Sequence, residues 1–349
     1  MSRILVTGGA GFIGSHTCLV LLEQGHELVV LDNFDNSSLE SLRRVQLLAG
    51  SSMLHVVKGD IRDPYAVEKA FKAASPVDGV IHFAGLKAVA ESVADPLRYW
   101  DVNLSGTRTL LAAMNRNNCR TIVFSSSATV YGHPKTLPIP ESATIQPINP
   151  YGCSKAAVEQ LLRDLDQSRP YSWRIASLRY FNPVGAHPSG LIGEDPLGIP
   201  NNLFPFICQV AVAEREQLQV FGNDWPTADG TGIRDYIHVM DLAEGHLAAL
   251  NVLMSEPPQL LEVNLGSGRG HSVFELVHAF EAASGISIPY EVVSRRAGDV
   301  TATVADPMLA AERLGWRTRR SLDEMCRDGW AWQKLNPQGY VQAADFGIP

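Results

Sequence analysis

A glycine-rich segment near the N-terminus constrains the fold of this chain more than any other feature. Residues 7–14 read Thr-Gly-Gly-Ala-Gly-Phe-Ile-Gly, directly after the apolar run Ile4–Val6 and directly before an apolar segment of helical length. In a strand–turn–helix unit the first glycine allows the tight turn, and the second lets backbone N–H groups approach a pyrophosphate. The third allows the helix to pack closely on the sheet. Gly8, Gly11 and Gly14 therefore predict a dinucleotide site at a helix N-terminus, where the helix dipole favours phosphate.

Short apolar runs alternate with longer segments of helical period through the first half of the chain. This is the rhythm of parallel βαβ units, and nearly continuous apolar strands are expected where helices cover both faces of the sheet. We predict an α/β fold: a Rossmann-type doubly wound parallel sheet with a smaller α/β substrate-binding domain. The predicted domains are residues 1–181 and 182–349, with some interleaving of the chain between them. The predicted strands are Ile4–Thr7, Leu28–Leu31, His55–Val57, Gly79–Phe83, Thr121–Ser125 and Ile175–Leu178.

The charge and composition exclude several classes of partner. The 349 residues include 37 acidic and 29 basic side chains, a net charge of -8, which disfavours an extended nucleic acid or an anionic membrane as partner. We see no signal peptide and no apolar run near the roughly 20 residues of a membrane helix, so we expect a cytoplasmic protein. Five scattered cysteines without C-x-x-C spacing, and histidines without ligand spacing, predict no metal site.

Further candidate dinucleotide residues follow the later strands. Asp32, 18 residues after Gly14, can bond the adenosine ribose hydroxyls and would repel a 2′-phosphate, so NAD is expected rather than NADP. Asp60 can accept a hydrogen bond from the adenine amino group, or it can serve as a capping or turn residue. Lys87 can reach a ribose, or it can be a solvated surface lysine. The predicted dinucleotide residues in this part of the chain are Gly8, Gly11, Phe12, Ile13, Gly14, Asp32, Asn33, Asp60, Ile61, Phe83, Ala84, Gly85 and Lys87.

A second motif carries residues suited to proton transfer. Asn149 and Pro150 are placed to cap and begin a helix, on which Tyr151 and Lys155, four residues apart, share one face. A nearby ammonium favours the phenolate and lowers the tyrosine pKa from about 10, which makes Tyr151 a usable base for a sugar hydroxyl. Ser127, after a predicted strand, can hydrogen-bond the reacting hydroxyl and pass its proton to Tyr151. Alone, a Tyr-x-x-x-Lys pair also occurs by chance; its distance after a dinucleotide motif favours catalysis.

These motifs together resemble the extended short-chain dehydrogenase/reductase superfamily. The likeness extends over Arg3 to Tyr340 and is similar in detail to the UDP-glucose 4-epimerase family. The segments that carry it are Phe83–Val89 (FAGLKAV), Phe124–Gly132 (FSSSATVYG), Arg179–Pro188 (RYFNPVGAHP), Gly198–Leu203 (GIPNNL) and Gly230–Asp241 (GTGIRDYIHVMD).

The resemblance implies an isomerase that interconverts UDP-glucose and UDP-galactose through a 4-keto sugar, on tightly bound NAD. It implies that Ser127, Tyr151 and Lys155 are catalytic, that Lys155 holds the nicotinamide ribose, and that Phe181 packs by the nicotinamide. It also implies a homodimer, with helices around 92–115 and 149–167 as candidate interfaces. The implied nucleotide-sugar residues are Ser127, Tyr151, Asn182, Asn202, Leu203, Gln219, Phe221, Arg234, Arg296, Asp299 and Thr303. Arg234 and Arg296 can neutralise two phosphates, Phe221 can flank uracil, and Asp299 can accept from a ribose hydroxyl.

Two positions depart from the family pattern or qualify it. Asn103 matches a nicotinamide-side asparagine of the family, but Val102 precedes it, where the family pattern differs. Thr303 occupies a family position that resembles a pocket gate, where a tyrosine restricts the sugar and a smaller residue admits a 2-acetamido group. We therefore hypothesise activity on UDP-N-acetylglucosamine and UDP-N-acetylgalactosamine.

Other functions are weighed against this one. A 4,6-dehydratase or decarboxylase of the same superfamily is the nearest alternative, but dehydratases need an acid and a base after the Ser/Thr, where Ala128 and Thr129 stand here. An ordinary reductase would release NADH. A catalytically silent NAD-binding regulator would be expected to lack the Tyr151 and Lys155 pair.

Overall fold

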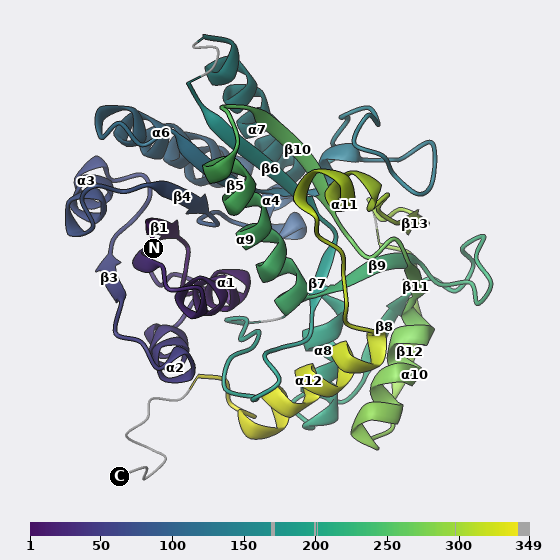
Figure 1. Ribbon diagram of the computed structural model, residues 1–349. Helices are drawn as coiled ribbons and strands as arrows, with labels where there is room; N and C mark the ends of the chain where they lie inside the picture. Colours follow the sequence, from purple (N-terminus) through teal and green to yellow (C-terminus); the bar gives the residue numbers. More distant parts are fainter. Residues whose placement is uncertain (169–171, 199, 201, 297, 341–349) are drawn as a thin grey trace, which may run out of the picture.

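A seven-stranded parallel sheet forms the centre of the larger part of the molecule (Figure 1). The computed structural model describes residues 1–168, 172–198, 200, 202–296 and 298–340. The strands lie in the order β10-β6-β5-β4-β1-β2-β3, and every pair is parallel. Their bounds are β1 Arg3–Thr7, β2 Glu27–Asp32, β3 Leu54–Lys58, β4 Gly79–His82, β5 Thr121–Ser127, β6 Arg174–Tyr180 and β10 Leu260–Leu265. The predicted fold class is confirmed, and the strand order reverses between β1 and β4, which is where such sheets bind ligands.

Helices cover both faces of this sheet. One face packs against α1 Phe12–Glu23, α2 Leu39–Ala49, α9 Val239–Ser255 and α11 Met308–Leu314, and the other against α3 Pro64–Ala73, α6 Gly106–Arg116 and α7 Pro150–Ser168. Successive residues of β1 alternate between the two cores: Ile4 and Val6 belong to the first, Leu5 to the second, and all three are fully buried. Burying one such side chain stabilises the fold by about 1.5–3 kcal/mol. Because helices cover both faces of the sheet, these three consecutive residues are all apolar, rather than every second one.

Short helices connect β4 to α6 and β5 to α7. The first connection contains α4 Val89–Ala94, α5 Pro96–Tyr99 and the π-helical turn η1 Trp100–Ser105, and the second begins with the 3₁₀ turn η2 Ala128–Tyr131. Single π-helical turns concentrate at functional sites, and this one carries Asn103.

The smaller part holds short strands and three helices, gathered at the lower right of Figure 1. Its strands are β7 Asn182–Val184, β8 Leu218–Phe221, β9 Ile233–His238, β11 Gly270–Ser272, β12 Tyr290–Val293 and β13 Ala302–Thr303. β9 pairs with β7, β11 and β13, and β8 pairs with β12. The helices α8 Leu203–Ala211, α10 Val273–Ser284 and α12 Leu322–Leu335 enclose a separate core that includes Phe204 and Phe280.

The chain passes more than once between the two parts. Past residue 181, α9, β10 and α11 pack with the large sheet. The other strands and helices of this half build the smaller part. The boundaries 1–181 and 182–349 stay predictions. Within the described residues no helix is both long and apolar enough to cross a membrane.

Candidate active site

A cleft of about 1020 Å³ opens at the carboxyl ends of the large sheet's strands and is closed on its far side by the smaller part. Twenty-three of the predicted site residues line it: Gly8, Gly11, Phe12, Ile13, Gly14, Asp32, Asn33, Asp60, Ile61, Phe83, Ala84, Gly85, Lys87, Ser127, Tyr151, Lys155, Phe181, Asn182, Asn202, Arg234, Arg296, Asp299 and Thr303. The structure places four others away from the lining: Asn103, Leu203, Gln219 and Phe221.

The glycine loop has no room for a side chain at Gly8 or Gly14. Gly8 has a φ of +68°, and a Cβ on it would lie 2.6 Å from the Ala84 nitrogen of the loop after β4. A Cβ on Gly14 would lie 2.3 Å from the Gly8 carbonyl oxygen, so the helix could not approach the loop. Helix α1 starts after Gly11 with no side-chain cap. Its first-turn N–H groups have no intrahelical acceptor and suit a phosphate.

The Asp32 carboxylate is part of this loop structure. It accepts hydrogen bonds from the Ala10 nitrogen, the Phe34 nitrogen and the Ser37 hydroxyl, each at 2.9 Å. An ionised carboxylate has about four lone-pair positions, so one remains for a ribose hydroxyl. Asp32 therefore both fixes the glycine turn and presents negative charge to the cleft.

Asp60 lies beside Asn33 at the next edge of the cleft. The Arg62 guanidinium donates to both of its oxygens at 2.9 Å, and the Asn33 amide donates at 3.2 Å. The hydrogen bonds from Arg62 are the main cause that lowers the pKa of Asp60 to about 2. The Asp60 carboxyl group is therefore ionised at physiological pH and can only accept hydrogen bonds, as a contact with an amino group requires.

The loop after β4 is positioned by Asn103. Its Oδ1 accepts from the Leu86 nitrogen at 2.8 Å, and its Nδ2 donates to the Leu86 carbonyl at 3.1 Å and to Ser154 at 2.9 Å. A Cβ on Gly85 would lie 3.0 Å from Asn103 Oδ1 and 3.7 Å from Lys155 Nζ, so the loop passes between them with no room for a side chain. Asn103 therefore lies behind the loop, fully buried, and joins it to α7.

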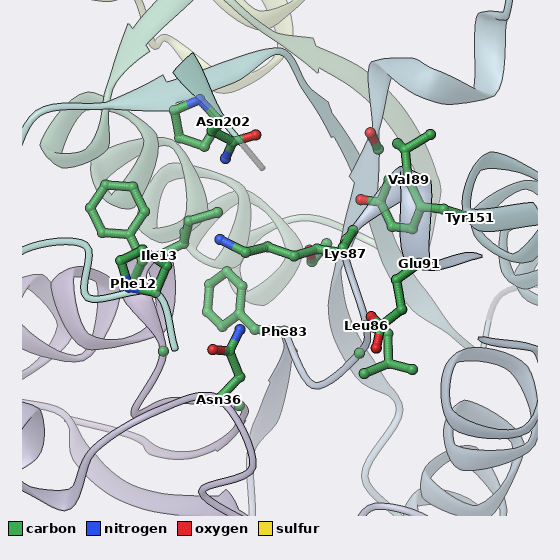
Figure 2. A pocket seen from close by; sticks show the side chains of 18 of the residues that line it. Phe12, Ile13, Asn36, Phe83, Leu86, Lys87, Val89, Glu91, Tyr151 and Asn202 are labelled. Carbon is green, nitrogen blue, oxygen red and sulfur yellow. The ribbon is translucent and has the colours of Figure 1, made fainter. Parts of the chain in front are cut away.

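Lys87 crosses the cleft from this loop. Figure 2 shows its side chain extended toward Phe12 and Ile13, above Phe83. Its Nζ forms an ion pair with Glu194 Oε1 at 2.9 Å. The lysine is half exposed, so it can exchange this partner for another anion in the cleft.

Tyr151 and Lys155 stand on the first turns of α7 as predicted. The Gly152 nitrogen donates to Asn149 Oδ1 at 2.8 Å, which caps the helix, and Pro150 is its first residue. Lys155 Nζ donates to the Ser125 carbonyl at 2.8 Å and lies 5.9 Å from the centroid of the Tyr151 ring. Both side chains are buried.

Burial dominates the electrostatics of this pair. It lowers the pKa of Lys155 to about 8, against an opposing effect of the Glu159 carboxylate. It also raises the pKa of Tyr151, which a hydrogen bond with Ser127 opposes. The sequence predicted a lowered tyrosine pKa; in the protein without ligand, burial of the phenol raises the pKa instead.

Ser127 ends β5 and is held in place by its neighbours. Its Oγ accepts from the Thr129 nitrogen at 3.2 Å and from the Thr129 hydroxyl at 2.9 Å. Since Thr129 supplies the donors, the Ser127 proton is free to point to another acceptor. Thr129 was not predicted as a site residue, although it stands in the quoted motif.

Two arginines and Asp299 form the opposite wall. Asp299 Oδ1 lies 2.9 Å from Arg296 Nη2 and 3.8 Å from Arg234 Nη2. Burial lowers the pKa of Arg234, whose Nη1 also donates to the carbonyls of Ile233 and Val300 at 2.9 and 3.0 Å. One carboxylate for two guanidinium groups leaves a net positive charge, which suits a diphosphate.

The remaining predicted residues surround this wall. The Arg296 guanidinium lies 5.4 Å from the Phe221 ring centroid, so Phe221 adjoins the cleft although it does not line it. Gln219 is exposed two residues earlier on β8, and Leu203 packs in the core of the smaller part. Thr303, partly buried, pairs in register with Arg234. Positions 199 and 201 of the 198–203 motif lie outside the described residues.

Several lining residues have no sequence signal. Gly193, Glu194, Asp195, Pro196 and Leu197 line the dinucleotide half, and so does Tyr340 near the C-terminus. They belong to an irregular segment and a chain end, where neither periodicity nor a motif predicts contact with the cleft.

The buried histidines have structural roles. His82 Nδ1 lies 2.6 Å from the Thr7 hydroxyl, and its Nε2 lies 2.8 Å from that of Thr107. Burial lowers the pKa of His82 to about 3, so it is neutral. His246 packs between Phe83 and Tyr180. Among the described residues no group of three His, Cys, Asp or Glu side chains is placed to hold a metal.

Comparison with known proteins agrees with this geometry. The family model described as GDP-mannose 4,6 dehydratase matches residues 5–329. The UDP-glucose 4-epimerase of Bacillus subtilis (strain 168) is 55% identical over 340 residues, 97% of this chain and 99% of that protein. The chain belongs to the UDP-glucose 4-epimerase family.

Solved structures of this family superpose closely on the chain. A UDP-glucose 4-epimerase from Bifidobacterium longum, in complex with NAD+ and UDP, is 49% identical, covers 97% of this chain and 100% of that one, and has a TM-score of 0.93. One from Stenotrophomonas maltophila, with bound NAD and formylated UDP-arabinopyranose, is 47% identical, covers 97% and 99%, and has the same TM-score.

Proposed function

We propose that this protein interconverts UDP-glucose and UDP-galactose, using tightly bound NAD and a transient 4-keto sugar. The observation that carries the proposal is the placement of Ser127, Tyr151 and Lys155 in one cleft, between the glycine loop and the wall formed by Arg234 and Arg296. The helix N-terminus at the glycine loop can thus bind a dinucleotide, and the two arginines can bind a sugar diphosphate. The residues suited to proton transfer lie between these two sites.

The residues present fit NAD. The glycines allow a tight turn in front of α1, the helix begins without a side-chain cap, and Asp32 keeps one lone-pair position unused. These features suit a pyrophosphate and a ribose. Lys155, beside Gly85, would hold the nicotinamide ribose. When bound, NAD supplies the hydride acceptor for C4 of the sugar and a positively charged ring.

Tyr151 is the proposed base. It takes the proton of the sugar 4-hydroxyl, while Ser127, oriented by Thr129, hydrogen-bonds that hydroxyl. Burial opposes the phenolate, so the positive charges at Lys155 and on bound NAD are needed to stabilise it. After the keto sugar has turned over, return of the hydride to the other face of C4 and of the proton from Tyr151 to its oxygen would complete the cycle. Because Arg234 and Arg296 hold the diphosphate, the keto sugar can turn over without leaving the cleft.

The absence of a second acid–base pair beside Ser127 favours epimerisation over elimination. Ala128 and Thr129 follow Ser127 in η2 and line the cleft, and neither can exchange a proton at C5 or C6. This supports an epimerase over the dehydratase alternative, although the matching family model carries a dehydratase description.

Turnover without added NAD tests the proposal. We expect purified protein to carry NAD and to convert UDP-galactose to UDP-glucose unaided. Tyr151→Phe keeps the fold and the NAD but loses activity by orders of magnitude, whereas Tyr65→Phe, an exposed tyrosine on α3, has no effect. Stoichiometric NADH release would indicate a reductase, and bound NAD without turnover a silent regulator; either refutes the proposal.

We further propose that Thr303 admits 2-acetamido sugars. Its short side chain lines the cleft beside Arg234, which leaves room that a tyrosine ring would occupy. The protein then converts UDP-N-acetylgalactosamine as well, and Thr303→Tyr reduces this turnover at least tenfold more than that of UDP-galactose. Undetectable acetamido turnover in the unchanged protein contradicts this.

A homodimer and a cytoplasmic location complete the proposal. Val93, Leu97 and Trp100 on α4, α5 and η1 are exposed, beside a shallow hollow lined by Trp100, Ile148 and Cys153, among others. We expect a second copy to cover this face, and Leu97→Arg to shift the mass in analytical ultracentrifugation to a monomer. If the unchanged protein is a monomer, the proposed dimer is refuted.

The proposed location is the cytoplasm. Five free thiols are expected in a reducing compartment, and the net charge of the chain is acidic.

A further inference from the structure

Residues 190–197, which we call the strap, cross the dinucleotide half of the cleft. Glu194 is ion-paired with Lys87 of the loop after β4, at 2.9 Å. The Leu197 nitrogen donates to Asn36 Oδ1, in the loop after β2, at 3.2 Å. Both loops belong to the predicted NAD site, so the strap spans it from one loop to the other.

The C-terminal segment packs against the strap through Trp332 and Tyr340. Tyr340 Oη accepts from the Gly193 nitrogen at 3.0 Å and donates to the Gly193 carbonyl at 3.1 Å, and the Tyr340 nitrogen donates to Asp195 at 2.8 Å. Trp332 Nε1 donates to the Glu194 carbonyl at 3.0 Å. A Cβ on Gly193 would lie 2.2 Å from the Trp332 ring, so the strap and the segment fit without a gap.

Arg44 on α2 connects both segments to the large sheet. Its Nη1 donates to the Leu191 carbonyl at 3.1 Å and to Asn336 Oδ1 at 2.6 Å. Its guanidinium lies 5.3 Å from the Tyr340 ring centroid, and Glu40 fixes it from the other side at 3.1 Å. The side chain is only 11% exposed, so these contacts are largely shielded from water.

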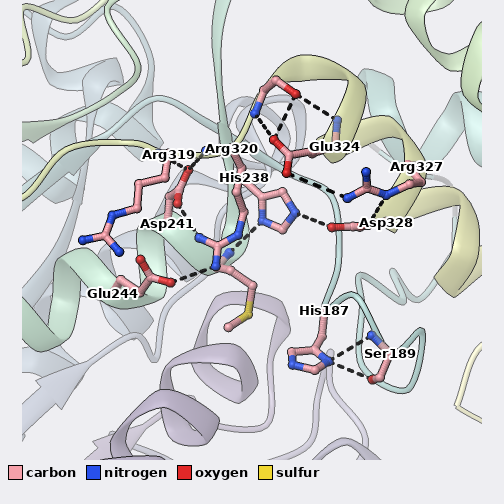
Figure 3. A network of polar contacts seen from close by, with 12 residues as sticks. His187, Ser189, His238, Asp241, Glu244, Arg319, Arg320, Glu324, Arg327 and Asp328 are labelled. Carbon is pink, nitrogen blue, oxygen red and sulfur yellow. Dashed lines mark hydrogen bonds and ion pairs between the residues drawn. The ribbon is translucent and has the colours of Figure 1, made fainter.

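The base of the strap and helix α12 are fixed separately. Figure 3 shows His238 beside Asp328 of α12, at 3.3 Å, and His187 bonded to Ser189 at the start of the strap. Arg320, just before α12, pairs with Asp241 of α9. Lifting the strap therefore breaks its contacts with Tyr340, Arg44 and Trp332 as well as those with Lys87 and Asn36.

We propose that Tyr340 and Arg44 are positioning residues that hold the strap over the dinucleotide and so slow its release. The inference rests on the proposed function in taking that dinucleotide to be NAD. Within the part of the chain that the structure describes, neither residue forms a hydrogen bond or ion pair with Tyr151, Lys155 or Arg234, so the two residues act on NAD exchange and leave the chemical step alone.

Exchange of bound NAD in the purified holoenzyme tests the proposal. The protein is mixed with excess isotopically labelled NAD, and replacement of the bound molecule is followed by mass spectrometry. Tyr340→Phe loses two hydrogen bonds but keeps the ring, and we expect roughly tenfold faster exchange. Tyr340→Ala and Arg44→Met exchange faster still, while kcat of Arg44→Met for UDP-galactose at saturating NAD is unchanged.

Arg43→Met is the matched control. Arg43 neighbours Arg44 on α2 and also pairs with Glu40, at 3.6 Å, but it is 57% exposed and has no bond to the strap. Its exchange should match that of the unchanged protein. A purely structural role for Tyr340 would lower the melting temperature without accelerating exchange in Tyr340→Phe, and that result overturns the proposal. So does equal acceleration in Arg43→Met. If the unchanged protein carries no NAD, the proposed function itself fails; if it carries NAD and turns over, only this inference is at stake.

Discussion

Lys155→Met should stabilise the protein while it abolishes activity. Lys155 is 5% exposed, and burial lowers its pKa from 10.5 to about 8. This difference corresponds to about 3 kcal/mol of folding free energy lost at neutral pH. Its hydrogen bond to the Ser125 carbonyl returns about 1 kcal/mol. Methionine fills a similar volume without charge, so we expect the variant to gain about 2 kcal/mol at pH 7.

The pH dependence identifies the cause. Below pH 8 Lys155 is charged in both the folded and the unfolded chain, so the folded protein carries the whole penalty. Between about 8 and 10.5 the folded lysine has lost its proton while the unfolded one retains it, and the stability of the unchanged protein relative to the variant rises with pH. The advantage of Lys155→Met should therefore be full at pH 7 and mostly gone by pH 10.

Urea unfolding of both proteins, after removal of any bound dinucleotide, measures this difference. Removal is needed because a ligand of the folded state would add its own stabilisation. Lys69→Met, at an exposed lysine on α3, should stay within about 0.5 kcal/mol of the unchanged protein at every pH. A Lys155→Met variant that is less stable at pH 7, or whose advantage is the same at pH 7 and 10, would refute the reasoning.

Two further predictions concern the frame of the site. Glu159→Gln should destabilise the protein by about 3–5 kcal/mol in urea unfolding, because it leaves a buried guanidinium without its carboxylate. The Glu159 carboxylate accepts hydrogen bonds from Arg179 at 2.9 and 2.7 Å, and the Arg179 side chain is 1% exposed. A loss of stability below about 1 kcal/mol would contradict this. Gly14→Ala should lower the stability of the dinucleotide-free protein, since its Cβ would meet the Gly8 carbonyl. Gly11→Ala, whose Cβ would lie 3.4 Å from the same oxygen, should leave that stability intact and reduce only the NAD that copurifies, as measured by absorbance after denaturation.

The sheet and the glycine loop could be predicted because local sequence carries the cause. Continuous apolar runs specify strands buried on both faces, and Gly8 and Gly14 stand where a side chain has no space. The helix cap at Asn149 was likewise predictable, because capping depends on residues three apart.

What the sequence did not predict depends on distant partners. The strand β10 joins the sheet 80 residues after its neighbour β6, and no local pattern marks that pairing. The strap and Tyr340 contact each other across 147 residues. The pKa of Tyr151 was predicted in the wrong direction for the protein alone, because spacing shows which charge is near but not how deeply the phenol is buried.

The net charge of -8 must be reconciled with a cleft proposed for two polyanions. The global field opposes their approach, so attraction must come from groups at contact distance. At the dinucleotide end these are backbone N–H groups of α1, which carry no formal charge and add nothing to the total. At the sugar end Arg234 and Arg296 share Asp299, and at the strap Lys87 is paired with Glu194. The three cations therefore have two carboxylates between them, and incoming phosphates must compete with these ion pairs. Binding should accordingly weaken with added salt less than the number of cations suggests, because phosphates partly replace existing ion pairs.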